Sequence, residues 1–412
     1  MSQSVGPLGQ VRIGDRAART LTAELHRRSG PKTALLIGVS PDSLVLAEAL
    51  TALREGDTLT IVGDERAPVL RAYIASLSPD VADLVTVVDS TGDAKPAEIV
   101  VVGEAVVGTA DDARSIMDSV THLVGDGGVL VIAAVAVPGI AGGAVDELDR
   151  QAALNGVGSD LVLRNTPPVR VHRLRFSDAD AKLAAKLAPA YRPSSVPLAG
   201  SMNIDSNGVA AAGITLGVAA LLKLIRPKSK AWLVPAIAAA PVAAFFRDPE
   251  REVPSDVASV VAASDGKVLS VERLYDERFA DEEFLRIAVF LSVLDVHVNR
   301  APIAGKVVDY FVEDGGYAAA MKPEAEHNVA AYTVLESAHG QGRVVVAQRT
   351  GLIARRIVQR APIGSLLAKG ERFGLIRFGS RTDVYLPADK AEALVAPGDR
   401  VVGAKTVIAR WL

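Results

Sequence analysis

The sequence contains no cysteine, which excludes disulfides, thiolate catalysis and cysteine-ligated zinc or iron–sulfur sites. Aromatic residues make up only 4% of the 412 residues, which suits α/β packing with small-residue helices better than an aromatic-rich sandwich. The net charge of -3 gives no overall basic field, so nucleic acid is not an expected partner. The opening MSQSVGPLGQVRIGDRAARTL lacks an apolar run after a basic start, and no secretory signal is predicted. No metal site is predicted.

Short apolar runs alternate with helical stretches in the first part of the chain, as in TALLIGV, DSLVLAEALTALREG and TLTIVGD. This alternation predicts a doubly wound, Rossmann-like α/β sheet over residues 1–185. The uninterrupted Val, Ile and Leu runs are typical of strands buried on both faces. Residues 186–207 follow with three prolines and no periodicity, so we expect a linker between domains there.

Two apolar segments, GVAAAGITLGVAALL and AWLVPAIAAAPVAAFF, lie within residues 208–250 on either side of the basic stretch KLIRPKSK. Each is shorter than the roughly 20 residues that cross a bilayer, and Pro235 and Pro241 interrupt the second. A crossing would also place the basic turn away from the cytoplasm, against the positive-inside bias. We therefore expect a membrane-associated helical hairpin that dips into one leaflet, with a buried helix pair in a soluble core as the alternative.

Residues 251–412 are rich in short alternating runs separated by Gly and Asp turns, which predicts a β-rich domain. The stretches GKVVDYFVEDGGYA and VAPGDRVVGAKTVIA share a GxV cadence, which indicates hammerhead or barrel-sandwich character. This cadence resembles biotinyl and lipoyl carrier domains. A carrier needs an exposed lysine at a hairpin tip, and Lys322 is followed by Pro323, which suits such a tip poorly.

Five blocks follow one another in this second half: FFRDPER, ASDGKV, FLSVLDVHVNRAPIAGKV, GLIARRIV and GERFGLIRFGSRTDVYLP. In that order they resemble the phosphatidylserine decarboxylase proenzymes, in the short form that cleaves itself at a Gly-Ser bond. The resemblance implies cleavage between Gly379 and Ser380, with Ser380 converted to a covalent pyruvoyl group. The α and β chains would remain together as a heterodimer, and no dissociable cofactor would be needed. Phosphatidylserine would then be decarboxylated to phosphatidylethanolamine through a Schiff base.

A serine hydroxyl needs an oriented base before it can act as a nucleophile. The resemblance assigns that base to His297, in DVHVNRAP, and the residue that orients the imidazole to Asp265, in SDGKV. Many relatives carry DYHRxHxP, and here Arg300 occupies the place of the second histidine. His297 is therefore expected to serve both self-cleavage and decarboxylation. A second departure is that Asn328 remains from an Asn-Glu-Arg run that relatives commonly have.

Arg355 and Arg356 are candidates for contacting the lipid phosphate, because guanidinium groups pair with phosphate in a bidentate manner. Their alternative is a solvated strand edge. A lipid substrate stays in the bilayer, so the expected location is the cell membrane, as a peripheral or monotopic protein on its cytoplasmic side.

Residues 1–185 resemble a class I S-adenosylmethionine-dependent methyltransferase domain. The strand-loop ALLIGVSPDS contains Gly38, and TLTIVGDE places Asp64 where an acid bonds the cofactor ribose in that family. The loop has a single glycine where such domains have several, so a scaffolding or regulatory remnant is the expectation and S-adenosylmethionine-dependent methylation the alternative. For the second half, an inactive, uncleaved membrane scaffold is the other alternative.

Overall fold

The computed structural model describes residues 11–137, 142–189, 195–199, 202–279, 282–352, 356–376 and 380–412. The chain forms two compact units, one of residues 1–193 with 364–366 and one of residues 194–363 with 367–412. The division between them falls within the predicted linker, 186–207.

The first unit is a seven-stranded sheet in the order β3-β2-β1-β4-β5-β7-β6. The strands are β1 (Thr33–Ile37), β2 (Thr58–Val62), β3 (Val85–Val88), β4 (Ala97–Val106), β5 (Val124–Val135), β6 (Gly156–Val162) and β7 (Val169–Leu174). The helices are α1 (Asp15–Leu21), α2 (Ala23–Arg27), α3 (Leu44–Thr51), α4 (Ala67–Ala75), α5 (Pro79–Ala82), α6 (Ala110–Val120) and α7 (Ala144–Asn155). Strands β1 to β5 pair in parallel, and β7 is antiparallel to both neighbours. The predicted doubly wound sheet is confirmed.

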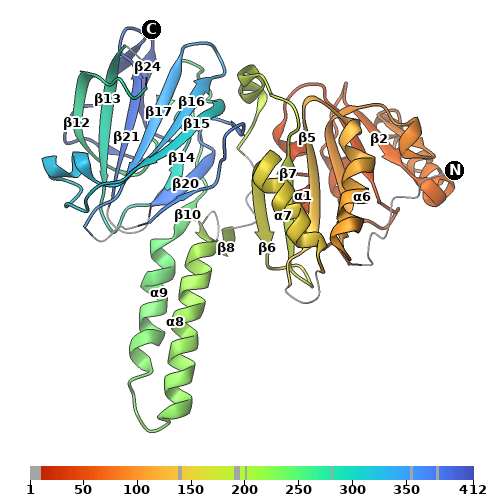
Figure 1. Ribbon diagram of the computed structural model, residues 1–412, viewed down its shortest axis with the longest axis horizontal. Coiled ribbons are helices and arrows are strands. Elements are labelled where there is room, and N and C mark those ends of the chain that lie inside the picture. The colour runs from red at the N-terminus through yellow and green to blue at the C-terminus, as the bar shows by residue number, and fades with distance from the viewer. Residues whose placement is uncertain are drawn as a thin grey trace. The chain divides into compact units, whose positions relative to one another are not determined.

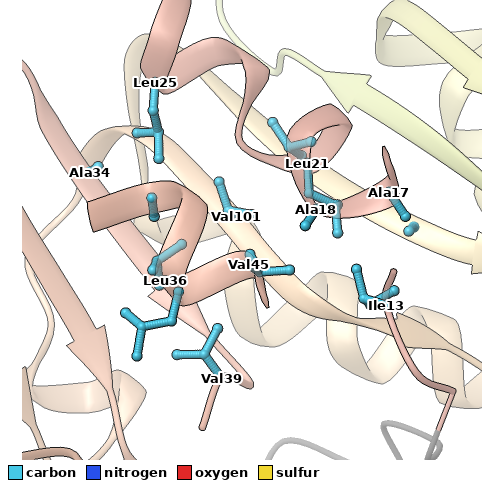
Figure 2. Close-up of a cluster of buried hydrophobic side chains, with 14 of the residues drawn as sticks. Ile13, Ala17, Ala18, Leu21, Leu25, Ala34, Leu36, Val39, Val45 and Val101 are labelled. Atoms are coloured by element: carbon cyan, nitrogen blue, oxygen red, sulfur yellow. The ribbon is translucent and has the colours of Figure 1, made fainter. Parts of the chain in front are cut away.

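Apolar side chains cover both faces of this sheet, because successive strand residues point in opposite directions. On one face Leu36 and Val101 pack with Leu21 and Leu25 of the first two helices and with Val45 of α3 (Figure 2). The opposite face is covered by α6, where Thr109 and Asp112 form a capping box that begins the helix.

The second unit is rich in β-structure, as predicted. Its helices are α8 (Ser206–Ile225) and α9 (Leu233–Phe245). Its strands are β8 (Ser195–Ala199), β9 (Met202–Asp205), β10 (Arg247–Pro249), β11 (Ser259–Val261), β12 (Gly266–Tyr275), β13 (Glu283–Leu291), β14 (Val298–Arg300), β15 (Gly305–Glu313), β16 (Ala330–Ser337), β17 (Arg343–Arg349), β18 (Ile357–Gln359), β19 (Leu366–Leu367), β20 (Arg372–Ile376), β21 (Ser380–Pro387), β22 (Ala391–Ala393), β23 (Arg400–Val401) and β24 (Val407–Trp411).

The largest sheet of this unit has the order β19-β15-β16-β17-β21-β13-β12-β23, and three smaller sheets have the orders β10-β9-β8, β11-β24-β22 and β14-β20-β18. Strand β21 is central, paired antiparallel with β13 and β17. The first stretch with the GxV cadence lies in β15 of the largest sheet, and the second is divided between β23 of that sheet and β24 of a smaller one. Hammerhead character therefore stays a prediction.

Residues of β21 alternate between the two faces of this sheet. Val384 and Leu386 pack into the larger apolar cluster on one face, whereas Tyr385 packs with Phe284 and Tyr332 on the other. By the same alternation Ser380 belongs to the face of Val384. This parity decides which side chains can reach the predicted cleavage site.

Helices α8 and α9 lie side by side and project from the sheets of the second unit (Figure 1). Asp205 caps α8 through Asn207 N–H and forms a bidentate pair with Arg360, which fixes the start of the helix. Apolar side chains are exposed along both helices: Ile214, Leu216, Val218, Leu221, Leu224, Ile225, Leu233, Val234 and Ile237. This exposure disagrees with the alternative of a buried helix pair.

The two prolines do not interrupt the second apolar segment, contrary to the expectation from the sequence. Pro235 lies in the first turn of α9, where a missing N–H costs no hydrogen bond, and the helix continues through Pro241 to Phe245. Among the described residues, one helix, Asn207–Ile225, is long and apolar enough to cross a membrane.

Candidate active site

Ser380 is the first residue of β21 and is completely buried. Its Oγ has no hydrogen-bond partner among the described residues. Buried hydroxyls usually have a hydrogen-bond partner, because leaving one unsatisfied costs about 1–3 kcal/mol. Gly379 and Arg377, which precede it, lie outside the described residues.

His297 precedes β14 and is 2% exposed. Its Nδ1 lies 2.9 Å from the carbonyl oxygen of Asp295. A carbonyl can only accept, so Nδ1 donates the hydrogen bond and Nε2 is the nitrogen that can take up a proton. Burial lowers the pKa of His297 to about 4, although the Asp295 carbonyl and carboxylate oppose this shift. The imidazole is therefore neutral at pH 7 and has the protonation state of a general base.

Asp265 lies just before β12 and is held by Arg251, with its two carboxylate oxygens 2.7 and 2.8 Å from the guanidinium nitrogens. Its Oδ1 also accepts the Gly403 N–H at 2.8 Å. The charge of Asp265 raises the pKa of His297, but less than Asp295 does. The Asp295 carbonyl accepts the hydrogen bond of Nδ1, and the orienting role of Asp265 stays a prediction.

The segments that carry the three predicted catalytic residues converge in this structure. The Ile376 N–H donates to the His297 carbonyl oxygen at 3.2 Å, four positions before Ser380. The hydroxyls of Ser264 and Thr382, both buried, lie 2.6 Å apart. Ser264 adjoins Asp265, and Thr382 shares the strand face of Ser380. The blocks far apart in sequence are thus joined within one unit.

The two departures from the family pattern have structural explanations. Arg300 is buried and pairs with the fully buried Asp248 at 2.8 Å. Burial lowers the pKa of Arg300 to about 10, with Arg372 adding to the effect, so Arg300 stays charged at pH 7 and cannot exchange protons as a histidine does. Asn328 is also buried, and its amide bonds the backbone of Ala318 and Thr350. Both residues hold the fold together.

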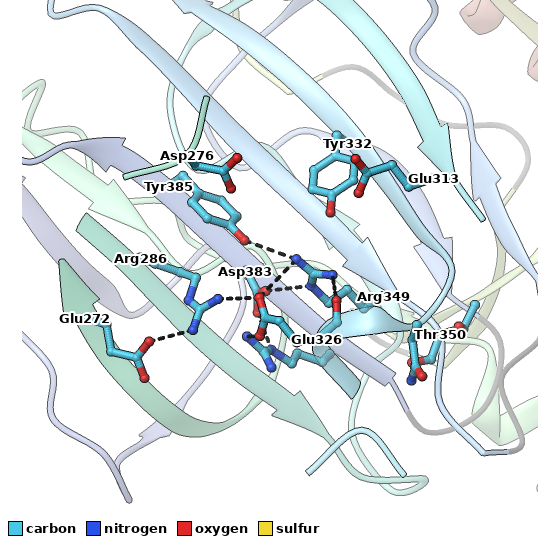
Figure 3. Close-up of polar contacts among 12 residues, drawn as sticks. Glu272, Asp276, Arg286, Glu313, Glu326, Tyr332, Arg349, Thr350, Asp383 and Tyr385 are labelled. Atoms are coloured by element: carbon cyan, nitrogen blue, oxygen red, sulfur yellow. Dashed lines mark hydrogen bonds and ion pairs between the residues drawn. The ribbon is translucent and has the colours of Figure 1, made fainter. Parts of the chain in front are cut away.

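A cluster of charged side chains lies on the face of the central sheet opposite to Ser380 (Figure 3). Asp383 accepts from Arg349 at 2.9 Å and from Arg381 at 2.6 Å. Glu326 pairs with Arg286 at 2.5 Å and with Arg381 at 3.1 Å. Arg381, which adjoins the predicted cleavage site in sequence, therefore points away from it.

The predicted phosphate-binding arginines are less defined. Arg355 lies outside the described residues, and Arg356 is exposed just before β18. Their role in binding phosphate stays a prediction.

In the first unit, Gly38 directly follows β1 and has a φ of 72°, and Asp64 lies two residues after β2 with a φ of 45°. Burial raises the pKa of the half-buried Asp64. A ligand of a doubly wound sheet binds where the strand order reverses, which here is between β1 and β4. Arg66 crosses that place, bonding the Val39 carbonyl at 3.4 Å and Glu104 at 2.9 Å.

The residues at this edge do not fit S-adenosylmethionine. Val39 follows Gly38 directly and is buried in the core, where a cofactor needs open glycine backbone. A Cβ atom on Gly103 would lie 2.5 Å from Val39 Cγ1, so Val39 packs closely against β4. Arg66, paired with Glu104 at 2.9 Å, adds a cationic side chain at the same edge.

Sequence reasoning missed three contacts of the site. Phe245 lies against His297, with ring centroids 4.2 Å apart, and Arg251 holds Asp265. Both residues belong to the block FFRDPER, which the sequence flagged without assigning it a role. A third contact, the buried pair Asn299 and Gln348 at 2.6 Å, had no signal beyond two amides in β-rich sequence.

Comparison with known proteins first defines the class of the second unit. It is similar to decarboxylases that are made as proenzymes. The family model for phosphatidylserine decarboxylase matches residues 239–409. A phosphatidylserine decarboxylase proenzyme of Symbiobacterium thermophilum is 48% identical over 167 residues, covering 40% of this chain and 77% of that protein. One of Desulfotalea psychrophila is 41% identical over 197 residues, covering 47% and 91%. The chain belongs to the phosphatidylserine decarboxylase proenzyme family.

Solved structures similar to this chain include methyltransferases. The O-methyltransferase TomG from Streptomyces achromogenes is 14% identical, with a TM-score of 0.29, covering 43% of this chain and 91% of that chain. The precorrin-6y C5,15-methyltransferase from Geobacter metallireducens is 17% identical, with a TM-score of 0.28, covering 39% and 87%. These TM-scores are too low to define a fold, and the strand order of the first unit defines it instead.

Proposed function

We propose that this chain is a self-processing, pyruvoyl-dependent decarboxylase that converts phosphatidylserine to phosphatidylethanolamine and CO2. The observation that carries the proposal is Ser380 Oγ, buried and without a partner among the described residues, on a segment joined to the neutral His297. Membership of the decarboxylase proenzyme family supports the substrate.

Self-cleavage begins when His297 Nε2 takes the proton of the Ser380 hydroxyl, and Oγ attacks the carbonyl carbon of Gly379. The C–N bond between Gly379 and Ser380 then breaks as the C–O ester bond forms, and the amine of residue 380 takes up a proton. Elimination across Cα and Cβ of residue 380 releases the carboxylate of Gly379, and hydrolysis releases ammonia. The products are a chain ending at residue 379 and one beginning with a pyruvoyl group at position 380.

The surroundings of Ser380 fit that group, because complete burial limits the access of water to a reactive carbonyl. When formed, the pyruvoyl group supplies the electron sink for decarboxylation. His297 then has a separate task at Nε2: it takes a proton from the substrate ammonium and returns it to the α-carbon after CO2 leaves. A neutral imidazole suits this sequence, since each transfer starts from an unprotonated Nε2 or restores it.

The two chains stay together as a heterodimer in this proposal. Strand β21, in the small chain, pairs with β13 and β17, which belong to the large chain. Asp383 of the small chain also pairs with Arg349 of the large chain in a buried site. These contacts do not depend on the bond that is cut.

We further propose that α8 and α9 insert into the cell membrane from its cytoplasmic side. Their exposed apolar side chains support this, as does the basic turn between them, which suits anionic headgroups. Arg355 and Arg356 remain the proposed contacts of the lipid phosphate. The first unit serves as a scaffold, which agrees with the poor fit of its crevice to S-adenosylmethionine.

A denaturing gel combined with intact-mass measurement tests the decarboxylase proposal. The expected result is a fragment of residues 380–412 with a blocked N-terminus, and Ser380→Ala abolishes it. The matched control is Ser270→Ala, a half-buried serine in β12 of the same sheet, which leaves cleavage intact. A single uncut band in the unmodified chain would refute the proposal.

A further inference from the structure

The end of α9 contacts the catalytic histidine directly. Phe245, the last residue of the helix, is 5% exposed, and its ring centroid lies 4.2 Å from that of His297 with the planes tilted by 40°. Phe246 packs edge-on against Phe245 at 5.0 Å and joins Leu375 in the same apolar cluster. The helical hairpin thus reaches the site.

The next residue of the chain ties the same helix end to the loop before His297. Arg247 donates to the Leu294 carbonyl oxygen and to the Ala244 carbonyl oxygen, and so joins α9 to the segment between β13 and β14. That segment exposes Val293 and Leu294, which are 49% and 82% exposed. The loop that carries His297 therefore presents apolar side chains to the surroundings, as the hairpin does.

The start of α8 packs closely against Phe246, at the end of α9. A Cβ atom on Gly208 would lie 2.4 Å from the Cβ of Phe246, so only glycine allows the two helices to meet here. Both helices of the hairpin are thus packed at the point where Phe245 and Phe246 cover the site.

We propose that Phe245 is a positioning residue for His297, and that the apolar hairpin thereby forms part of the catalytic site as well as an anchor. The proposal rests on the assignment of His297 under the proposed function. Among the described residues, the charges with the largest effect on His297 are those of Asp295 on its own loop, Arg247 after α9 and Asp265 before β12. Phe245 fills the apolar side of the ring and keeps water from it.

Shrinking this side chain admits water to His297 and raises its pKa towards the usual 6.5, because burial is the main cause of the low value. The series Phe245→Leu, Phe245→Val and Phe245→Ala therefore produces a graded rise, smallest for Leu and at least one unit for Ala. Phe311→Ala is the matched control, since Phe311 stacks on Tyr332 in a different apolar cluster. It leaves the pKa of His297 unchanged.

The pKa is measured by NMR titration of His297 in the full chain with Ser380→Ala, reconstituted in nanodiscs of phosphatidylglycerol and phosphatidylcholine. A second readout is the pH profile of self-cleavage in chains that keep Ser380. As the pKa of His297 rises, the pH below which cleavage fails moves upward with it, and Phe245→Leu retains most of the original profile. The pKa and the profile move together only if Phe245 acts through His297.

The same pKa in every folded member of the Phe245 series would overturn the proposal, and Phe245→Leu keeps the series informative if Phe245→Ala does not fold. A shift of equal size in Phe311→Ala would overturn it too. Failure of the proposed function is distinguishable, because the pKa titration uses a chain that cannot cleave itself. If the unmodified chain stays uncut while the Phe245 series still shows a graded rise in the pKa of His297, self-processing is refuted and positioning is supported.

Discussion

Replacing Asp383 by asparagine tests what holds the small chain in the central sheet. The carboxylate is completely buried between Arg349 and Arg381, whose side chains are 1% and 6% exposed. The substitution Asp383→Asn would keep the shape and remove the charge, leaving the two buried guanidiniums to share the partly exposed carboxylate of Glu326. Breaking a buried ion pair on one side costs about 3–5 kcal/mol, and we expect that loss in the free energy of unfolding.

Urea unfolding followed by tryptophan fluorescence measures this loss, because both tryptophans, Trp232 and Trp411, belong to the second unit. The measurement uses the Ser380→Ala chain so that cleavage does not change the number of chains. With a slope of roughly 2–3 kcal/mol per M, the midpoint falls by about 1–2.5 M urea. The matched control is Asp309→Asn, an exposed carboxylate in β15 of the same sheet, which changes stability by no more than about 0.5 kcal/mol.

The pH dependence gives a second check on Asp383. Burial raises its pKa, but the charges of Arg381 and Arg349 outweigh burial, so the pKa in the folded chain lies below its usual value. A carboxyl whose pKa is lowered by folding contributes stability above its unfolded pKa, and this is lost as the pH falls. The difference between the two chains is therefore full at pH 7 and shrinks below about pH 4. A loss under about 1 kcal/mol at pH 7 would refute the reasoning.

Three further outcomes are expected. His297→Ala removes the base and abolishes self-cleavage on a gel. In the unmodified chain the cleavage rate stays constant from pH 8 to pH 5 and falls near pH 4, because His297 becomes protonated there. A fall near pH 6.5 would contradict the burial of His297. Leu221→Asp places a charge in the exposed part of α8 and lowers binding in vesicle flotation at least tenfold, whereas Leu412→Asp, at the exposed C-terminus, does not. Calorimetric titration of the full chain with S-adenosylmethionine gives no heat of binding, and Arg66→Ala alone does not restore it; clear binding by the unmodified chain would show that the crevice is open.

Much of the architecture could be predicted from the sequence because it follows from local patterns. The uninterrupted apolar runs of the first unit correctly predicted buried parallel strands, and the Gly and Asp turns correctly predicted the β-rich second unit. The predicted interruption by the prolines of α9 was wrong for a physical reason. Pro235 lies in the first turn, where no hydrogen bond is lost, and the helix continues on both sides of Pro241.

The site was harder to predict, because its contacts depend on which chain segments meet. Ser380 and His297 were found through ordered blocks, but the contact of Phe245 with His297 joins positions 52 residues apart on different elements. Asp265 was assigned to orient the imidazole by analogy with a triad. In the structure its carboxylate pairs with Arg251, a contact that no sequence pattern indicated, and its role toward His297 stays a prediction.

Strand β21 lies in the middle of a sheet between two strands that both precede it in the chain. Until residues 380–387 pair with them, β13 and β17 each have a strand edge whose backbone hydrogen bonds are not formed. Ser380, the first residue of β21, reaches its buried position only once that gap is filled. Under the proposed function, self-cleavage therefore follows the docking of β21 between β13 and β17, so that folding of the central sheet controls when the reaction starts.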